Sequence, residues 1–414
     1  MNRPAALILP ILMATLSTGM VQAKSPSAPH WVPVWYASPE PAGPVDKELV
    51  NATLRQIVRV SANGTNIRLR LSNAYGKDPL HIDAIRVAKR EGGSRIDVAT
   101  DRPVTFSGHE SVTIAPGAWA LSDPLDLTVA TQSDIAVSLY VSESTPLTTL
   151  HDNQRAALYV ASGDLTRAAD LPVASVDIGI GNGCPWLTEV EVSGTTAKSA
   201  VVAFGDSITD GYGITPDKGA TWPQLLSQRF QVAHIPLSVV NAGISGNRLL
   251  HNGQWIRFGD AALARFDRDV LAQPNVSATI LLIGINDLGH SKGPGAAEYV
   301  SGQDIVDGLT QIAERAHERG IRVYAATLTP FKGTIFTDYY SDDKETQRLL
   351  VNGWIRHSKL IDGVIDFDAA VMAPEAPDHM QPDLALTDHL HPNDAGAKIM
   401  ADAVPLNLFD WAKH

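Results

Sequence analysis

Three residues in the second half of the chain are of the types that ester hydrolysis needs. Ser207 directly follows a short apolar run, 200–204, and a Gly-Asp turn, which makes its hydroxyl a candidate nucleophile. A serine hydroxyl is weak unless a base takes its proton, and His391 is the candidate base. Asp388, three residues earlier, can orient the imidazole and stabilise its charged form. Together they predict a Ser-His-Asp triad.

The same part of the chain offers donors for the oxyanion that such an attack creates. The predicted donors are the backbone N–H groups of Ser207 and Gly243 and the side-chain amide of Asn286. Gly243 lies in the segment Asn-Ala-Gly-Ile-Ser-Gly, and Asn286 lies in the segment Gly-Ile-Asn-Asp. Each segment follows an apolar run of strand length, so each is expected at the end of a strand.

A parallel sheet would bring these segments together. Beyond residue 197, short apolar runs alternate with amphipathic stretches, which predicts βαβ units. The predicted strands span residues 200–204, 238–241, 278–284, 322–328 and 363–367. The predicted helices span residues 221–230, 260–270, 302–319, 343–358 and 394–406. Open α/β sheets bind ligands at the carboxyl ends of their strands, so the site is expected there.

Residues 30–196 show a different pattern, with short alternating strands between turn residues and little helix signal. This predicts an all-β, jelly-roll-like sandwich as an accessory domain. Asn63-Gly64 lies between two alternating runs, 56–62 and 66–71, and predicts a hairpin. In the second run, Ile67, Leu69 and Leu71 would face the core. Four aromatic residues could stack on sugars, although core packing is the commoner role of such residues. They are Trp31, Trp35, Tyr75 and Trp119.

Residues 1–23 predict a signal peptide. Arg3 precedes an apolar stretch, and Val21-Gln22-Ala23 fits the small-x-small cleavage pattern. The stretch is short for a membrane span, so we expect a secreted or periplasmic protein with no integral membrane segment after cleavage. The catalytic domain would then comprise residues 197–414.

Composition narrows the partners further. The formal net charge of −12 disfavours nucleic acid and anionic membrane surfaces, which both select basic proteins. The single cysteine, Cys184, cannot form an intramolecular disulfide and is expected to be buried.

The four segments together resemble the blocks of the SGNH hydrolases, also called GDSL esterases/lipases. The resemblance rests on Gly205-Asp206-Ser207, Gly243, Gly284-Ile285-Asn286-Asp287 and the Asp-x-x-His spacing of residues 388–391, in this order. Ile208 replaces the leucine that is frequent in this family. The resemblance implies a three-layer, flavodoxin-like α/β/α sandwich with a five-stranded parallel sheet, and acyl-ester hydrolysis without a cofactor. A looser similarity is to exported bacterial members with an N-terminal β domain.

Three alternatives stay open at this stage. Ser291 lies in a G-x-S-x-G pattern, but Gly293-Pro294-Gly295 disfavours the helix that should follow it. Asp388, His389 and His391 could instead chelate a metal, with Asp378 and His379 nearby in sequence, although no metal site is predicted. The protein could also bind polysaccharide on a hydrolase scaffold without catalysis.

The substrate is less defined than the reaction. Specificity would depend on the loops 251–258, 331–342 and 373–386, whose composition identifies no acyl chain. No long apolar lid helix is evident, which favours short-acyl or carbohydrate-linked esters over long-chain lipids. A lysophospholipase or lipase-type acylhydrolase is the alternative enzyme.

Overall fold

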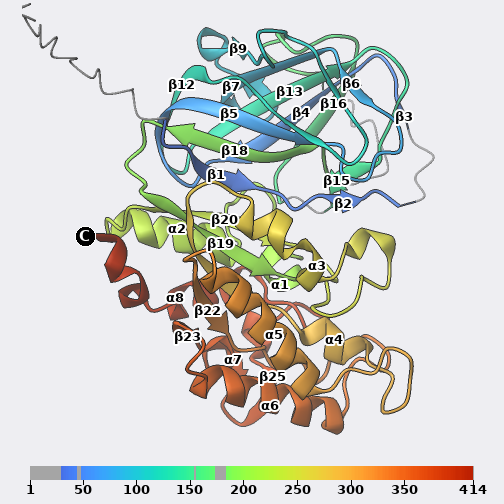
Figure 1. Cartoon of the computed structure of the whole chain (residues 1–414), viewed down its shortest axis with the longest axis vertical. Coiled ribbons are helices and arrows are strands. Elements are labelled where there is room, and N and C mark those ends of the chain that lie inside the picture. Colours follow the sequence, from blue (N-terminus) through green and yellow to red (C-terminus); the bar gives the residue numbers. More distant parts are fainter. Residues whose placement is uncertain (1–28, 44–47, 153–154, 173–182, 414) are drawn as a thin grey trace, which may run out of the picture.

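The computed structural model describes residues 29–43, 48–152, 155–172 and 183–413 (Figure 1). The predicted signal peptide, residues 1–23, lies outside this range. A strand-rich part is followed along the chain by a part in which strands and helices alternate. No helix in the described part of the chain is long and apolar enough to span a bilayer.

The strand-rich part is built mainly from two antiparallel sheets. One runs in the order β1 (Val32–Tyr36), β18 (Leu187–Ser193), β5 (Gly64–Ser72) and β11 (Trp119–Leu121), with β12 (Leu125–Val129) also paired to β5. The other runs in the order β16 (Leu158–Ser162), β4 (Ala52–Arg59), β13 (Asp134–Val141), β7 (Ala84–Gly92) and β8 (Arg95–Ile96), with β9 (Arg102–Pro103) paired to β7. Shorter ladders join β10 (Val112–Ile114) to β6 (Leu80–Ile82), β14 (Thr145–Pro146) to β3 (Glu48–Leu49), and β15 (Thr149–His151) to β17 (Cys184–Pro185) and β2 (Glu40–Pro41).

Apolar side chains from both sheets form one core. On β5, Ile67, Leu69 and Leu71 are completely buried, as their alternation predicted. The predicted hairpin at Asn63-Gly64 is wrong, because β4 and β5 lie in different sheets. A turn-forming dipeptide fixes a change of direction but not the pairing of the strands that flank it, and here the chain crosses from one sheet to the other.

The second part contains a five-stranded parallel sheet. Its order is β20 (Leu237–Gly243), β19 (Ser199–Gly205), β21 (Val276–Leu282), β22 (Arg322–Ala326) and β23 (Gly363–Ile365). All five overlap the strands predicted from sequence. The chain moves from β19 outward to β20 and then returns to the other side of β19 with β21. This reversal creates a topological switch point, where ligand sites of open α/β sheets form.

The long helices also agree with the prediction, within a few residues at each end. They are α2 (Trp222–Val232), α5 (Gly302–His317), α6 (Asp342–His357) and α8 (Asp394–Ala403). Thr221 caps α2 and Ser301 caps α5, each in a reciprocal capping box with a polar residue three positions later. The predicted helix 260–270 is α3 (Ala262–Phe266) followed by a π-helical turn, Asp267–Leu271.

The sequence did not predict the short elements. These are α1 (Ser207–Asp210), α4 (Ile285–His290), α7 (Phe367–Val371), β24 (Met372–Ala373) and β25 (Ala376–Met380). Elements of this length contain too few side chains for a periodic pattern to be recognised. Two of them, α1 and α4, begin shortly after β19 and β21 and carry predicted site residues.

The two parts are in direct contact. The Ser238 hydroxyl on β20 donates to the Pro33 carbonyl on β1 at 2.7 Å, and Tyr36 of β1 packs into the core of the second part. Tyr75 also reaches across, because its hydroxyl donates to Asp260 at 2.6 Å. Of the four aromatics considered for sugar stacking, only Trp119 is exposed, so packing explains most of this set.

Candidate active site

Ser207 is the first residue of α1 and follows β19 after a single residue, Asp206. The Asp206 side chain caps this turn by accepting from the Ile208 N–H at 3.0 Å. Only glycine fits at position 205, because a Cβ there would lie 2.3 Å from the Thr209 hydroxyl oxygen and 2.5 Å from the Leu282 carbonyl oxygen. The Gly-Asp-Ser sequence therefore allows a strand to enter a helix within two residues, and the turn places Ser207 at the helix N-terminus.

The three predicted triad residues are joined by hydrogen bonds. The Ser207 hydroxyl lies 2.8 Å from His391 Nε2, and His391 Nδ1 lies 2.7 Å from Asp388 Oδ2. Because a carboxylate only accepts, Nδ1 carries the ring proton and Nε2 is left to accept from the hydroxyl. All three residues are buried, at 5–7% exposure. This arrangement can move a proton from Ser207 to His391.

Asp388 is held in its charged form. Burial raises the pKa of this carboxyl, but the hydrogen bond from the His391 ring and those from the backbone N–H groups of Leu390 and His391 outweigh it. Its pKa therefore falls to about 2. The Asp-x-x-His spacing makes this possible, because the turn that brings His391 onto Asp388 also directs two N–H groups at the carboxylate.

The structure corrects one predicted oxyanion donor. The Gly243 N–H donates to Asn241 Oδ1 at 2.9 Å and is therefore not free to bind an oxyanion. A Cβ at Gly243 would lie 2.3 Å from the Asp210 backbone nitrogen. Gly243 is thus required for the close packing of α1 against the end of β20, which is a structural reason for a glycine at this position.

Gly246, three residues later, has the free backbone N–H that was predicted for Gly243. Its φ of +74° is in the region that favours glycine, and no acceptor for its N–H is found among the described residues. The neighbouring Asn247 carbonyl accepts from Asn286 Nδ2 at 3.0 Å. This bond brings the Gly246 turn next to the Asn286 amide, the other predicted donor. The segment 241–246 contains two glycines, and its sequence does not show which of them has a free N–H.

Asn286 is fixed on both sides of its amide. Its Oδ1 accepts from the Tyr339 hydroxyl at 2.8 Å, which leaves Nδ2 as the donor end. One Nδ2 hydrogen is used by Asn247, and the described residues offer no acceptor for the other. The next residue, Asp287, accepts from the backbone N–H groups of Leu249 and Leu250 and so anchors the segment that follows Gly246.

A buried arginine connects the strand ends beneath the site. Arg265, on α3, donates to the Gly205 carbonyl at 2.8 Å, to the Ala242 carbonyl at 2.9 Å and to Asn247 Oδ1 at 3.0 Å. The first two acceptors lie at the ends of β19 and β20, and the third belongs to the turn next to Gly246. Asp269 compensates the charge of Arg265 at 2.9 Å, and both side chains are fully buried.

We expect Asp269→Asn to lower the free energy of unfolding by about 3–5 kcal/mol, because it leaves a buried guanidinium without its counter-charge. Urea denaturation would measure this, with Asp267→Asn as control, since its exposed ion pair with Arg315 should contribute less than about 1 kcal/mol. Although burial opposes it, Arg268 and Arg265 hold the Asp269 pKa at about 2, below its ordinary value. The wild type should therefore lose this stability as pH falls from about 4 towards 2. A loss equal to that of Asp267→Asn would contradict the expectation.

Two aromatic side chains flank His391. The Tyr212 ring centroid lies 4.5 Å and the Phe336 centroid 6.3 Å from that of the imidazole. Both side chains are partly exposed, at 41% and 42%. They provide apolar surface for a substrate group next to the candidate nucleophile. Phe336 belongs to the loop 331–342, which is predicted to determine specificity, whereas no pattern in the sequence points to Tyr212.

The other candidate residues do not form a second site. The Ser291 hydroxyl donates to the Val300 carbonyl and accepts from the Val300 N–H, so it fastens the segment that follows α4. His379 pairs with Asp378, its neighbour in sequence, at 2.7 Å. Within the described ranges, no group of three or more His, Cys, Asp or Glu side chains could hold a metal ion. Cys184 is buried, as predicted.

Comparison with known proteins bears on the second part of the chain. Residues 203–399 match the GDSL-like Lipase/Acylhydrolase family. Similar solved structures include an acetyl xylan esterase, at 22% identity over 49% of this chain and 96% of that chain, with a TM-score of 0.37. An α/β hydrolase from the metagenome of Lake Arreo, Spain, is 22% identical over 52% and 96%, with a TM-score of 0.38. A psychrotrophic esterase from Pseudoalteromonas sp. is 18% identical over 52% and 99%, with a TM-score of 0.37. A search of curated proteins gave no match.

The parallel sheet and the matched residues define the second part of the chain as a hydrolase domain. This domain is a member of the GDSL-like lipase/acylhydrolase family, as the four sequence segments predicted. The assignment rests on residues 203–399, which contain every residue of the site described above.

Proposed function

We propose that the protein is an exported serine esterase that hydrolyses carboxylic esters of short acyl groups or of carbohydrates. The observation that carries this proposal is the chain of two hydrogen bonds from Ser207 through His391 to Asp388. Export rests on the signal-peptide pattern of residues 1–23. We further propose residues 30–196 as a jelly-roll-like domain and residues 197–414 as a three-layer α/β/α domain.

In the proposed mechanism, Ser207 Oγ attacks the ester carbonyl while His391 Nε2 takes its proton. Asp388 stabilises the imidazolium that results and keeps its Nδ1–H in place. The negative charge on the carbonyl oxygen is bound by the N–H groups of Ser207 and Gly246 and by Asn286 Nδ2. His391 then gives its proton to the departing alcohol, and the acyl group remains on Ser207. Water, activated by the same imidazole, releases the acid.

The surroundings of His391 offer apolar contact to an acyl group or a sugar ring. Tyr212 and Phe336 offer partly exposed aromatic faces, which suit an acyl chain or the apolar face of a saccharide. The export predicted from residues 1–23, together with the additional strand-rich part, extends the proposed substrates to esters of polysaccharides.

Covalent labelling tests this function. We expect a fluorophosphonate probe to modify one residue, and peptide mapping by mass spectrometry to place the modification on Ser207. Hydrolysis of a p-nitrophenyl ester series and of acetylated xylan would then rank the substrates. An unlabelled protein, or a label on Ser291, would contradict the proposal; activity only on long-chain esters would favour a lipase-type acylhydrolase.

A further inference from the structure

One buried histidine of the strand-rich part reaches the helix that carries Ser207. His151, on β15, is buried, and its Nε2 lies 3.2 Å from Asp210 Oδ1. Asp210 is the last residue of α1, and Ser207 is the first. A side chain from outside the hydrolase domain therefore contacts the element that positions the candidate nucleophile.

Both ring nitrogens of His151 face acceptors. Nδ1 lies 3.0 Å from the Ser38 carbonyl oxygen and 2.9 Å from Glu40 Oε1, while Nε2 faces Asp210. A neutral imidazole has a single N–H, so only the doubly protonated ring can donate on both sides. Burial alone would lower the pKa of His151, but the carboxylates of Glu40 and Asp210 raise it well above its ordinary value. Burial raises the pKa of Glu40 to about 7, so the protonated ring pairs with Asp210 on one side and, on the other, with a carboxyl group that is only partly charged at neutral pH.

Asp210 extends this contact to the oxyanion side of the site. Its Oδ2 accepts from the Ser245 hydroxyl at 2.5 Å, and Ser245 directly precedes Gly246. The Asn241 side chain also donates to the Thr209 carbonyl at 2.7 Å, which ties α1 to the end of β20. The position of Asp210 therefore affects both Ser207, on its own helix, and the Gly246 N–H.

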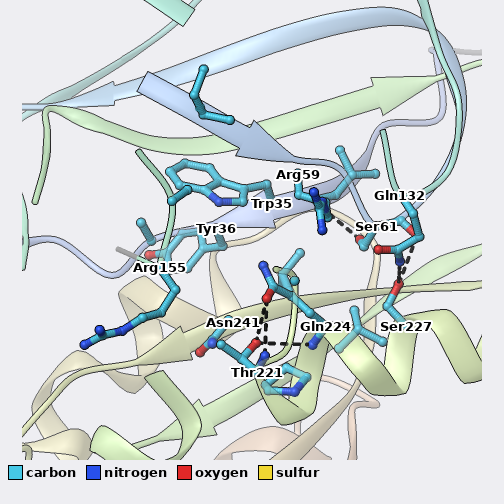
Figure 2. A pocket seen from close by; sticks show the side chains of 18 of the residues that line it. Trp35, Tyr36, Arg59, Ser61, Gln132, Arg155, Thr221, Gln224, Ser227 and Asn241 are labelled. Atoms are coloured by element: carbon cyan, nitrogen blue, oxygen red, sulfur yellow. Dashed lines mark hydrogen bonds between the residues drawn. The ribbon is translucent and has the colours of Figure 1, made fainter. Parts of the chain in front are cut away.

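A cavity of about 70 Å³ lies between the two parts, next to this contact. Figure 2 shows Trp35 and Tyr36 of the strand-rich part on one wall and Asn241 and Thr221 on the other. His151 and Asp210 also line it. This volume has room for a few water molecules and lies far below the roughly 300–1,000 Å³ of a typical ligand pocket. The His151–Asp210 ion pair therefore spans a region where the two parts are not closely packed.

We propose that His151 is a positioning residue for ester hydrolysis. Through Asp210 it holds α1 and the Gly246 turn in the arrangement in which the Ser207 hydroxyl meets His391. The strand-rich part is then a component of the active centre and not only an accessory domain. The inference rests on the proposed esterase function, and His151 itself touches no substrate.

Full-length His151→Gln tests this inference with p-nitrophenyl acetate. We expect kcat, per active site titrated with fluorophosphonate, to fall by about 10- to 100-fold, because small displacements of reacting groups have effects of this size. KM should change by less than about threefold. The matched control is His81→Gln, an exposed histidine of the same part bonded to Thr113, and it should keep wild-type kcat.

Asp210→Asn changes the other partner of the same contact, in the hydrolase domain. It replaces His151→Gln as the test if that variant does not fold. The double variant should lose little more activity than Asp210→Asn alone, because both changes break one link. A purely structural role would lower the melting temperature and the titrated fraction while each titrated site kept wild-type kcat, and this result would overturn the inference. An inactive wild type would overturn the esterase function as well, whereas an active wild type with unaffected variants would overturn only the role of His151.

Discussion

Ser207→Ala is expected to reduce kcat/KM for p-nitrophenyl acetate by roughly 10⁴-fold or more. Alanine removes the oxygen that attacks the ester and the donor that meets His391 Nε2 at 2.8 Å. The residual rate would come from water in a site that still binds the ester and retains its oxyanion donors. Steady-state kinetics at substrate concentrations around KM would measure the loss.

The fold should survive this change. Ser207 lies at the N-terminus of α1, and the cap of that helix is the Asp206 side chain, which the substitution leaves in place. The far-ultraviolet circular dichroism spectrum should therefore match that of the wild type. The free energy of unfolding, measured by urea denaturation, should agree to within about 1 kcal/mol. Ser291→Ala is a suitable control, since it removes another buried serine hydroxyl, one that is bonded to the backbone of Val300. Wild-type activity in Ser207→Ala would exclude Ser207 as the nucleophile, and a comparable loss in Ser291→Ala would show that the loss is not specific to Ser207.

Sequence patterns predicted those parts of the fold that depend on periodicity. Apolar runs such as 200–204 identified the parallel strands, and the capped amphipathic stretch that starts at Ser301 identified α5. The pairing of strands could not be read in the same way. Asn63-Gly64 has the composition of a hairpin turn, but which sheet each flanking strand joins depends on contacts with β13 and β18, far away in sequence.

The arrangement of the candidate site was predictable where a residue is proposed to act through its own side chain. Side-chain type alone suggested Ser207, His391 and Asp388, and the structure places these three in one hydrogen-bonded chain. The glycine proposed for the oxyanion site could not be chosen in this way, because a backbone N–H is available only if nothing else accepts it, and Asn241 accepts that of Gly243. The contribution of His151 was also invisible, since no pattern links residue 151 to residue 210 before the two parts are placed together.

The other large effect is expected for Asp388→Asn. In the wild type, Asp388 Oδ1 accepts from the backbone N–H groups of Leu390 and His391, each at 3.0 Å, while Oδ2 faces His391 Nδ1. An asparagine that keeps its oxygen on the two backbone donors must turn its NH₂ group towards Nδ1. That nitrogen then becomes an acceptor, and the ring proton moves to Nε2. In this tautomer His391 cannot take the proton of Ser207.

The reverse orientation of the introduced amide would preserve the tautomer but would point an NH₂ group at two backbone N–H groups, leaving these donors without an acceptor. We therefore expect kcat to fall by about 10⁴-fold, with little change in KM. The wild-type pKa of about 2 keeps Asp388 charged at every pH at which the enzyme is assayed, so raising the pH should not mimic or remove its contribution. Asp378→Asn, which alters a partly exposed Asp-His pair, should leave kcat within about twofold.

Combining Ser207→Ala with Asp388→Asn shows whether the two residues act together as parts of a triad or contribute to the rate independently. If Asp388 acts only through His391 on Ser207, the double variant Ser207→Ala/Asp388→Asn should be no slower than Ser207→Ala alone. Additive losses, or a kcat for Asp388→Asn within about tenfold of wild type, would show that the hydrogen bond at 2.7 Å holds His391 in place without controlling its proton. In that case the imidazole would select its tautomer without Asp388, and the site would operate as a Ser-His pair.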